Sequence, residues 1–251
     1  MLREEVVFGP IHSRRLGSSL GINLLPEKGK ICNFDCIYCE CGWNSDGRGD
    51  TVLPTAARVR EALEKKLKEV VAEGIAIDSI TFSGDGEPTL NPEFPQIVDD
   101  TIALRDKYIP KAKVSVLSNA TRVHIPEIFN ALRKIDKPIL KIDAPTNEKI
   151  AIINRPAPGY DVARVIEALR GFKGDFILQT MFLRTEGFDS SKPEMLDKWM
   201  KIVRELRPRE IMVYTIDRPT PASGLQKFSV DEMRTLVTPL LDEGFKIQIC
   251  G

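Results

Sequence analysis

Short apolar runs alternate along this chain with longer segments in which apolar residues recur at helical spacing. The short runs predict strands, and the longer segments predict helices. The predicted strands cover 19–24, 77–82, 114–117, 138–143, 176–182, 211–216 and 245–249. The predicted helices cover 54–73, 93–107, 125–134, 160–171, 193–206 and 229–242. Residues 1–18, which contain Gly9-Pro10, are predicted to form a loop.

Strict alternation of strands and helices indicates a parallel sheet with right-handed crossovers. The pattern contains six β–α units and one further strand, which is fewer than the eight units that close a full barrel. We therefore predict an α/β fold, an open partial (β/α)6 barrel of parallel strands with an additional C-terminal strand. The chain has no internal repeat, low-complexity tract or linker, so we expect a single domain over 1–251.

Composition narrows the class of protein further. The 251 residues are 42% hydrophobic, and 36 basic residues balance 36 acidic ones. This balance gives no overall charge that would draw the chain to nucleic acid or to a membrane surface. No apolar run approaches the length of a membrane span, and the first residues do not resemble a signal peptide. We therefore expect no membrane partner. Three of the five cysteines are clustered, which favours reduced thiols that bind a metal, and hence a cytoplasmic protein.

The clustered cysteines are Cys32, Cys36 and Cys39. Thiolates are soft ligands, and so short a segment can wrap only one compact metal centre. A structural zinc site requires a second pair of ligands, but the only histidines are His12 and His124. A four-iron cluster with three ligated irons and one open iron fits better, and an open position is typical of a chemical site. The alternative is three buried or disulfide-bonded cysteines, which so crowded a loop does not favour.

With Tyr38 directly before the third cysteine, this motif resembles the cluster loop of radical S-adenosylmethionine (SAM) enzymes. The resemblance implies a [4Fe–4S] cluster on the three cysteines, with SAM chelating the open iron and Tyr38 near the adenine. It also implies reductive cleavage of SAM to a 5′-deoxyadenosyl radical, which abstracts hydrogen from a substrate. A flavodoxin- or ferredoxin-like electron donor would supply the electron. The partial barrel is the fold that this family implies.

Ligands of parallel α/β sheets bind beyond the carboxyl ends of the strands, so residues there are candidates for a SAM site. Gly84-Asp85-Gly86-Glu87 follows the strand at 77–82, and its glycines allow close approach of the backbone to a ligand. With Pro88 it resembles the Gly-Gly-Glu-Pro motif that binds the SAM amino group, with Asp85 in place of a glycine. The alternative is a solvated turn.

Ser118-Asn119 follows the next strand and resembles the Ser/Thr-Asn-Gly segment near the SAM ribose. Helix N-capping is the alternative there. Asp143 and the inward-facing Gln179 are the remaining candidates for the SAM site.

Lys141 and Asp143 are two residues apart on a strand and should share one face. Burying two charged side chains inside a barrel costs free energy, so we expect them either to form an ion pair or to have a function. We expect burial to lower the pKa of Lys141, so that its neutral amine could form a Schiff base with a carbonyl substrate. The alternatives are a simple ion pair with Asp143 or a contact with SAM.

Arginines follow four predicted strands, at positions 122, 155, 184 and 218, and Arg14-Arg15 precede the first. They predict a positively charged face at the ends of the strands, which we call the positive mouth. Such a face suits an anionic substrate, the SAM carboxylate or an RNA backbone. Solvated loop charge is the alternative.

Four further stretches resemble the wyosine-forming enzymes, which convert a methylated guanine in tRNA with pyruvate and use a second cluster. They cover 13–17, 20–23, 36–41 and 214–219. Residues 1–31 contain no cysteine, and Cys41 and Cys250 are too few to hold that second cluster. We therefore predict a radical SAM enzyme whose unidentified substrate carries an anionic or carbonyl group. The alternatives are a tRNA-modifying enzyme, a glycyl-radical-type activating enzyme, and a non-enzymatic iron–sulfur electron carrier or zinc-binding module.

Overall fold

The computed structural model of the chain describes residues 5–13, 15–47 and 49–251. These residues form two compact units, which are described one at a time. The first unit comprises Met1–Asn33, Asn44–Ser118 and Ile125–Pro138, and the second comprises Phe34–Trp43, Asn119–His124 and Ile139–Gly251. The single domain over 1–251 stays a prediction.

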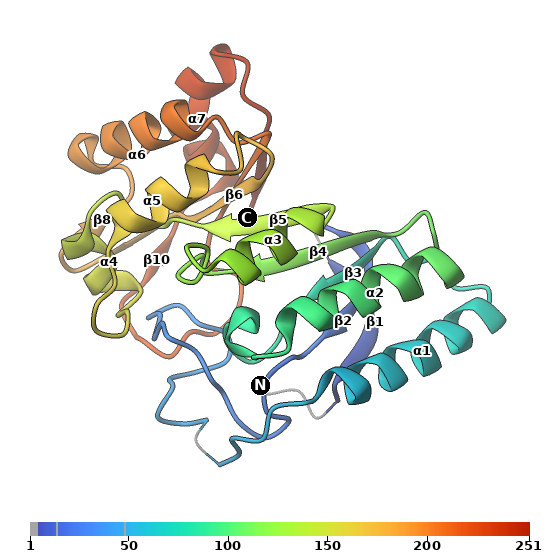
Figure 1. The fold of residues 1–251 in the computed structure, drawn as a ribbon. Coiled ribbons are helices and arrows are strands. Elements are labelled where there is room, and N and C mark those ends of the chain that lie inside the picture. The colour runs from blue at the N-terminus through green and yellow to red at the C-terminus, as the bar shows by residue number, and fades with distance from the viewer. Residues whose placement is uncertain (1–4, 14, 48) are drawn as a thin grey trace. The chain divides into compact units, whose positions relative to one another are not determined.

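The first unit contains four strands in the order β1-β2-β3-β4: Val7–Ser13, Gly17–Ile22, Ser79–Phe82 and Lys113–Ser118. β2, β3 and β4 are parallel, whereas β1 is antiparallel to β2. The helices of this unit are α1 (Ala56–Ala72), α2 (Phe94–Tyr108) and α3 (Pro126–Lys134), which lie side by side in Figure 1. A short 3-10 helix, Pro88–Leu90, follows β3.

The two faces of this part of the sheet differ in chemistry. Apolar residues such as Leu20, Ile80 and Val114 are fully buried and alternate with hydroxyl-bearing residues, as the period of a strand requires. Phe82 packs edge-on against Phe94 of α2, so the apolar face is the one that the helices cover. On the other face the hydroxyls of Ser19 and Thr81 lie 2.9 Å apart.

The loop predicted over residues 1–18 is wrong in part, because β1 lies within it. The Gly9-Pro10 pair that indicated a loop falls in a shift of register between Phe8 and Ile11. The turn residues therefore sit inside an irregular strand, and β1 covers the edge of β2 that would otherwise lack a partner.

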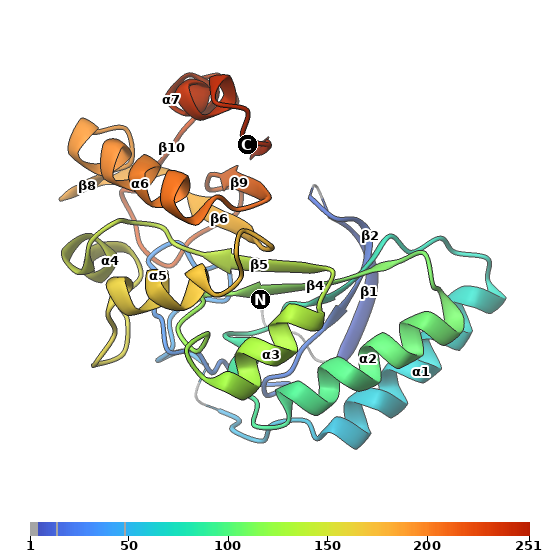
Figure 2. The ribbon, with the colours of Figure 1, turned by 45° about the horizontal axis from the view of Figure 1, so that its top comes forward.

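The second unit contains four parallel strands in the order β5-β6-β9-β11. Their bounds are Lys137–Lys141, of which Ile139 onward belongs to this unit, Ile177–Met181, Glu210–Tyr214 and Ile247–Cys250. Its helices are α4 (Asn147–Ile153), α5 (Val162–Arg170), α6 (Pro193–Leu206) and α7 (Val230–Asp242). α5 and α6 pack against each other, as Figure 2 shows.

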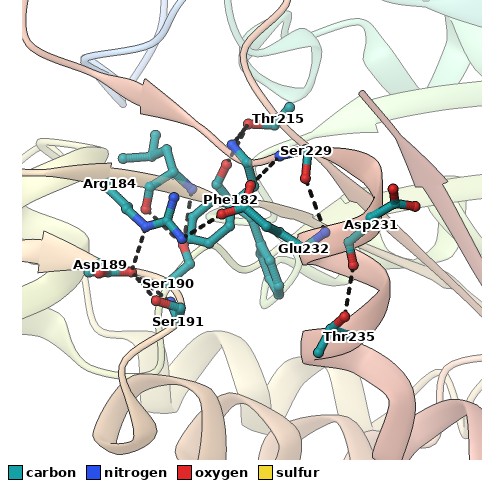
Figure 3. A network of polar contacts seen from close by, with 12 residues as sticks. Phe182, Arg184, Asp189, Ser190, Ser191, Thr215, Ser229, Asp231, Glu232 and Thr235 are labelled. Carbon is teal, nitrogen blue, oxygen red and sulfur yellow. Dashed lines mark hydrogen bonds and ion pairs between the residues drawn. The ribbon is translucent and has the colours of Figure 1, made fainter.

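A separate small sheet has the order β10-β7-β8, with bounds Gln226–Lys227, Leu183–Thr185 and Phe188–Asp189. In Figure 3 Arg184 of β7 lies between Asp189 of β8 and Glu232 of α7. The sequence pattern did not predict this sheet or α4, because strands of two or three residues and a helix of two turns are too short to show a period.

All six predicted β–α units are present, and β11 adds the predicted last strand beside β9. The predicted α/β class of parallel strands with an additional C-terminal strand is therefore confirmed. Within the described parts of the chain, no helix combines the length and the apolar character needed to cross a membrane.

Candidate active site

The turn that follows β3 is hydrogen-bonded to Ile31, the residue before Cys32. Ile31 N donates to Asp85 O at 3.1 Å, and Glu87 N donates to Ile31 O at 3.1 Å. These bonds form an isolated parallel bridge between Ile31 and Gly86. Gly86 has a φ of +137°, and a β carbon there would collide with the Ile31 carbonyl oxygen, so only glycine fits. The predicted cofactor turn and the start of the cysteine loop are therefore neighbours in the fold.

The acidic side chains of this turn are buried and bonded to nearby side chains and backbone. The side-chain oxygen Oδ1 of Asn23 accepts from Asp85 N at 3.2 Å, and Asn23 Nδ2 donates to Asp85 Oδ2 at 3.4 Å. Glu87 Oε1 accepts from Ser118 Oγ at 2.8 Å and from the backbone and hydroxyl of Thr89. The structure thus brings the predicted residues Glu87 and Ser118 together, in contacts that hold the shape of the turn.

In the second unit, the middle of the cysteine loop runs beside the end of α4. Asp35 N donates to Asn154 O at 2.9 Å, and Ile37 N donates to Ile153 O at 3.0 Å. Cys39 N donates to Cys36 O at 3.1 Å and closes a turn between these two cysteines. The loop segment that carries Cys36 is therefore fixed by its backbone to the C-terminal end of α4.

Five polar side chains of the second unit meet at the end of β5, and we call them the Tyr38 cluster. They are Tyr38, Lys141, Asp143, Asn154 and Tyr214. Asp143 Oδ2 accepts from the Tyr38 hydroxyl and from Asn154 Nδ2, and Asp143 Oδ1 accepts from Met181 N at 2.9 Å. Lys141 Nζ donates to Tyr214 at 2.5 Å and to Tyr38 at 3.1 Å. Asp143 thereby connects the cysteine loop to the strands.

Lys141 and Asp143 do share one face, as predicted, since Lys141 Nζ lies 3.8 Å from Asp143 Oδ2. The expected lowering of the lysine pKa is wrong. Burial lowers the pKa of Lys141, but Asp143 and the Tyr214 hydroxyl outweigh burial and hold it above its ordinary value. Because a protonated amine is not a nucleophile, the predicted Schiff base loses its premise.

Two other groups of the Tyr38 cluster region have shifted pKa values. Burial raises the pKa of the Cys36 thiol to about 11, although Lys141 and Asn154 act in the opposite direction. Burial, followed by the negative charge of Asp143, raises the pKa of Tyr38. The surroundings of Cys36 therefore disfavour a bare thiolate, which needs a positive partner such as a metal to form there.

Gln179 and Asn119 were also predicted to line the site. Gln179 is buried and stands in register with Lys141 on the neighbouring strand, and its Nε2 has no hydrogen-bond partner among the described residues. Asn119 Oδ1 accepts from Thr121 N at 3.1 Å and from Thr121 Oγ1 at 2.7 Å. Because α3 begins only at Pro126, the alternative that Asn119 caps a helix is wrong.

The arginines that follow the strands carry less free charge than predicted. The guanidinium of Arg184 lies over the Phe228 ring and pairs with Glu232 at 3.0 Å. Figure 3 shows Arg184 directed toward Glu232. Arg218 pairs with Glu40 at 2.8 Å, and the guanidinium of Arg155 lies over the Trp43 ring. Arg14 lies outside the described residues. Acidic partners therefore offset part of the predicted positive mouth.

Asn154 is the site residue that sequence reasoning missed. It is fully buried, and its Nδ2 lies 3.3 Å from Cys36 Sγ and 2.8 Å from the Tyr38 hydroxyl. It ends α4, a helix that the sequence pattern did not predict. The proline at position 156 was the available signal, because helices usually end before a proline.

The donor atoms fit an iron–sulfur cluster. None of the five cysteines is in a disulfide, and Cys36 Sγ already meets an amide donor of the kind that accompanies cluster thiolates. Within the described residues, no three His, Cys, Asp or Glu side chains are arranged as closely as a metal site requires. The assignment of Cys32, Cys36 and Cys39 therefore rests on their spacing and on the donor at Cys36.

Comparison with known proteins gives a family and a fold. The model of the radical SAM superfamily matches residues 27–191. The chain is 31% identical over 249 residues to the UPF0026 protein of Methanocaldococcus jannaschii, covering 95% of this chain and 71% of that protein. It is 31% identical over 236 residues to the protein named GTPase Obg of Brachyspira hyodysenteriae, covering 92% of this chain but only 33% of that protein.

Two solved structures are similar in fold. The SuiB protein of Streptococcus suis, crystallised with S-adenosylmethionine, has a TM-score of 0.64 and 15% identity, over 89% of this chain and 49% of SuiB. A radical SAM methyltransferase of Sphaerobacter thermophilus has a TM-score of 0.69 and 14% identity, over 92% of this chain and 65% of that enzyme. These likenesses agree with the predicted partial-barrel fold. The matched family model shows that the chain belongs to the radical SAM superfamily and is therefore an enzyme that uses a [4Fe–4S] cluster and SAM.

Proposed function

We propose that this enzyme binds its cluster through Cys32, Cys36 and Cys39 and binds SAM against the turn at Gly84–Glu87. The observation that carries the proposal is the backbone bridge between Ile31 and Gly86, which joins the SAM turn to the residue before Cys32. When bound, the two cofactors supply a 5′-deoxyadenosyl radical that abstracts hydrogen from a substrate. The protein supplies binding, orientation and exclusion of water.

The remaining candidates have distinct proposed roles. Gln179 Nε2, which has no partner among the described residues, is a donor for SAM, because a buried donor without a partner is costly unless a ligand satisfies it. Tyr38 and Asp143 hold the cysteine loop on the end of β5, and Ser118 holds Glu87. Lys141 is a positioning residue between Tyr38 and Tyr214 rather than a nucleophile. Asn119, whose side chain shapes its own turn, remains a candidate near the ribose.

The enzyme needs an electron donor and a substrate. We propose a donor of the flavodoxin or ferredoxin class and a substrate that carries an anionic group. A carbonyl group on that substrate is not part of the proposal, because the raised pKa of Lys141 removes the argument for a Schiff base. A tRNA substrate and a partner protein that receives a radical are the alternatives, and purified tRNA and protein substrates are the probes that would distinguish them.

The test is cluster reconstitution followed by SAM cleavage. The protein should bind about four irons, and Cys32→Ala, Cys36→Ala and Cys39→Ala should each abolish the cluster absorbance. The reduced wild-type protein should release 5′-deoxyadenosine from SAM slowly without substrate, which chromatography measures. Cys41→Ala and Cys250→Ala are the matched controls and should retain both properties. A Cys41→Ala protein that lost the cluster would contradict the open-iron site.

A further inference from the structure

The Asn154 amide lies between the cysteine loop and the end of β5. Its Nδ2 contacts three acceptors: Cys36 Sγ at 3.3 Å, the Tyr38 hydroxyl at 2.8 Å and Asp143 Oδ2 at 2.8 Å. Its backbone is fixed as well, because Asn154 N donates to Ile150 O at 2.8 Å and Asn154 O accepts from Asp35 N. Contacts of its backbone and of its side-chain amide therefore both hold Asn154 against Cys36.

The orientation of this amide is determined by its neighbours. Asn154 Oδ1 is buried and has no hydrogen-bond partner among the described residues. Exchanging the amide oxygen and nitrogen would place a carbonyl oxygen against the Asp143 carboxylate and against the Cys36 sulfur, and both would then face an acceptor instead of a donor. In the observed orientation Nδ2 faces three acceptors, while Oδ1 is left without a donor among the described residues. An unsatisfied buried acceptor is costly, so the contacts of Nδ2 must outweigh that cost.

A donor directed at a ligating sulfur changes the electronic properties of a cluster. Hydrogen bonds to cluster sulfurs stabilise the more negative, reduced state and are among the factors that set the reduction potential. Resting on the function proposed above, we propose that Asn154 donates a hydrogen bond to the Cys36 sulfur and thereby raises the reduction potential of the cluster. Asn154 then acts as a positioning residue that makes the cluster easier for the electron donor to reduce.

The test is a redox titration of the reconstituted full chain, followed by electron paramagnetic resonance without SAM. Asn154→Leu keeps a side chain of similar size and removes the donor. We expect the reduction equilibrium to move about tenfold toward the oxidised cluster, which is a midpoint about 59 mV more negative for a one-electron couple. Iron content should stay at the wild-type value, because Asn154 is not a ligand.

The matched control is Asn147→Leu on the same helix. Asn147 Nδ2 donates to Asp161 Oδ1 at 3.0 Å, and its Oδ1 accepts from Val162 N at 2.8 Å, so this variant also removes the hydrogen bonds of an asparagine side chain of α4, but away from Cys36. Its midpoint should equal that of the wild type. A midpoint in Asn154→Leu equal to the wild-type value would overturn the proposal.

A second variant keeps the test decisive if Asn154→Leu does not load iron. Asn154→Ser retains a hydroxyl donor and should give a midpoint between those of the wild type and a donor-free site. If neither Asn154 variant binds iron while Asn147→Leu does, Asn154 is needed to assemble the cysteine loop. That result would overturn its proposed effect on the reduction potential. A wild-type protein that binds no iron would instead count against the proposed function itself.

Discussion

Asp143 is the residue on which most contacts of the candidate site converge. Its carboxylate accepts from the Tyr38 hydroxyl, from Asn154 Nδ2 and from Met181 N, and the ammonium group of Lys141 lies nearby. The side chain is fully buried. A carboxylate so completely surrounded by protein donors acts as a structural anchor of the cysteine loop, and its contact with SAM stays a prediction.

Replacing Asp143 with alanine should destabilise the protein by roughly 3–5 kcal/mol, because it leaves the Lys141 ammonium group without its counter-ion and three donors without this acceptor. Denaturant unfolding in the absence of cofactors measures this change. Asp175→Ala is the control, since Asp175 pairs with Arg209 at the surface and its loss should cost at most about 1 kcal/mol. Equal effects of the two substitutions would refute the anchoring role.

Gly86 should tolerate no side chain. In Gly86→Ala the new methyl group meets the Ile31 carbonyl oxygen next to Cys32, so we expect loss of both SAM binding and cluster loading. Gly74→Ala is the matched control, because Gly74 also has a positive φ but a β carbon there has nothing within 4 Å. Iron analysis and equilibrium dialysis of SAM make the comparison. Full iron content in Gly86→Ala would show that the bridge is not needed for the cluster.

At the residue scale, the sequence predicted the cysteine motif but not the side chains that contact it. Three cysteines within eight residues carry their own chemistry in the sequence. Asn154 lies 118 positions after Cys36, and no local pattern connects the two. The direction of the Lys141 pKa was mispredicted because burial was given more weight than the charge of Asp143, two positions away, and because Tyr214, 73 positions away on β9, adds to the effect of Asp143.

At the scale of elements, the repeating units were predictable because each has a clear period. Helix α6 (Pro193–Leu206) has the predicted bounds, with a proline in its first turn. The element that was mistaken, β1, carries turn residues inside a strand, so its local composition opposes the pairing that β2 imposes on it. Tertiary pairing outweighed local preference there.

A pair of helices in the first unit should give the protein part of its acid sensitivity. Hydrogen bonds from the Tyr108 hydroxyl and the Lys107 ammonium of α2 lower the pKa of Glu64 of α1 from 4.5 to about 2. A group with a lowered folded pKa stabilises the fold above its unfolded pKa. This contribution is therefore complete above about pH 4.5 and is lost as the pH falls toward 2.

The variant Glu64→Gln should show a flatter dependence of stability on pH between 4.5 and 2, measured by urea unfolding at a series of pH values. Glu61→Gln removes one charge from the exposed face of the same helix and is the control. The two variants should differ in slope within that window. Identical slopes in both would mean that the contact between α1 and α2 contributes nothing to acid stability.

At the scale of the whole molecule, the alternation of elements predicted the fold class, whereas composition predicted little about partners. Equal numbers of basic and acidic residues give no net charge, and the paired arginines of the second unit show that local charge is largely compensated there as well. We therefore expect a few positioned groups, rather than net charge, to recognise ligands; Gln179, whose Nε2 lacks a partner among the described residues, stays a predicted residue of the SAM site. Such placement depends on tertiary structure and is not visible in the sequence.

The single-domain prediction has a calorimetric test. Each of the two compact units is assembled from three separate stretches of the chain, so no single cut isolates either of them. Units interleaved in this way should fold together, and we expect one heat-absorption peak on thermal unfolding. For 251 residues the enthalpy should be roughly 175 kcal/mol near 60 °C, equal to the van 't Hoff value. Two resolved peaks, or a calorimetric enthalpy about twice the van 't Hoff value, would instead mean that the units unfold independently and that the chain is two domains.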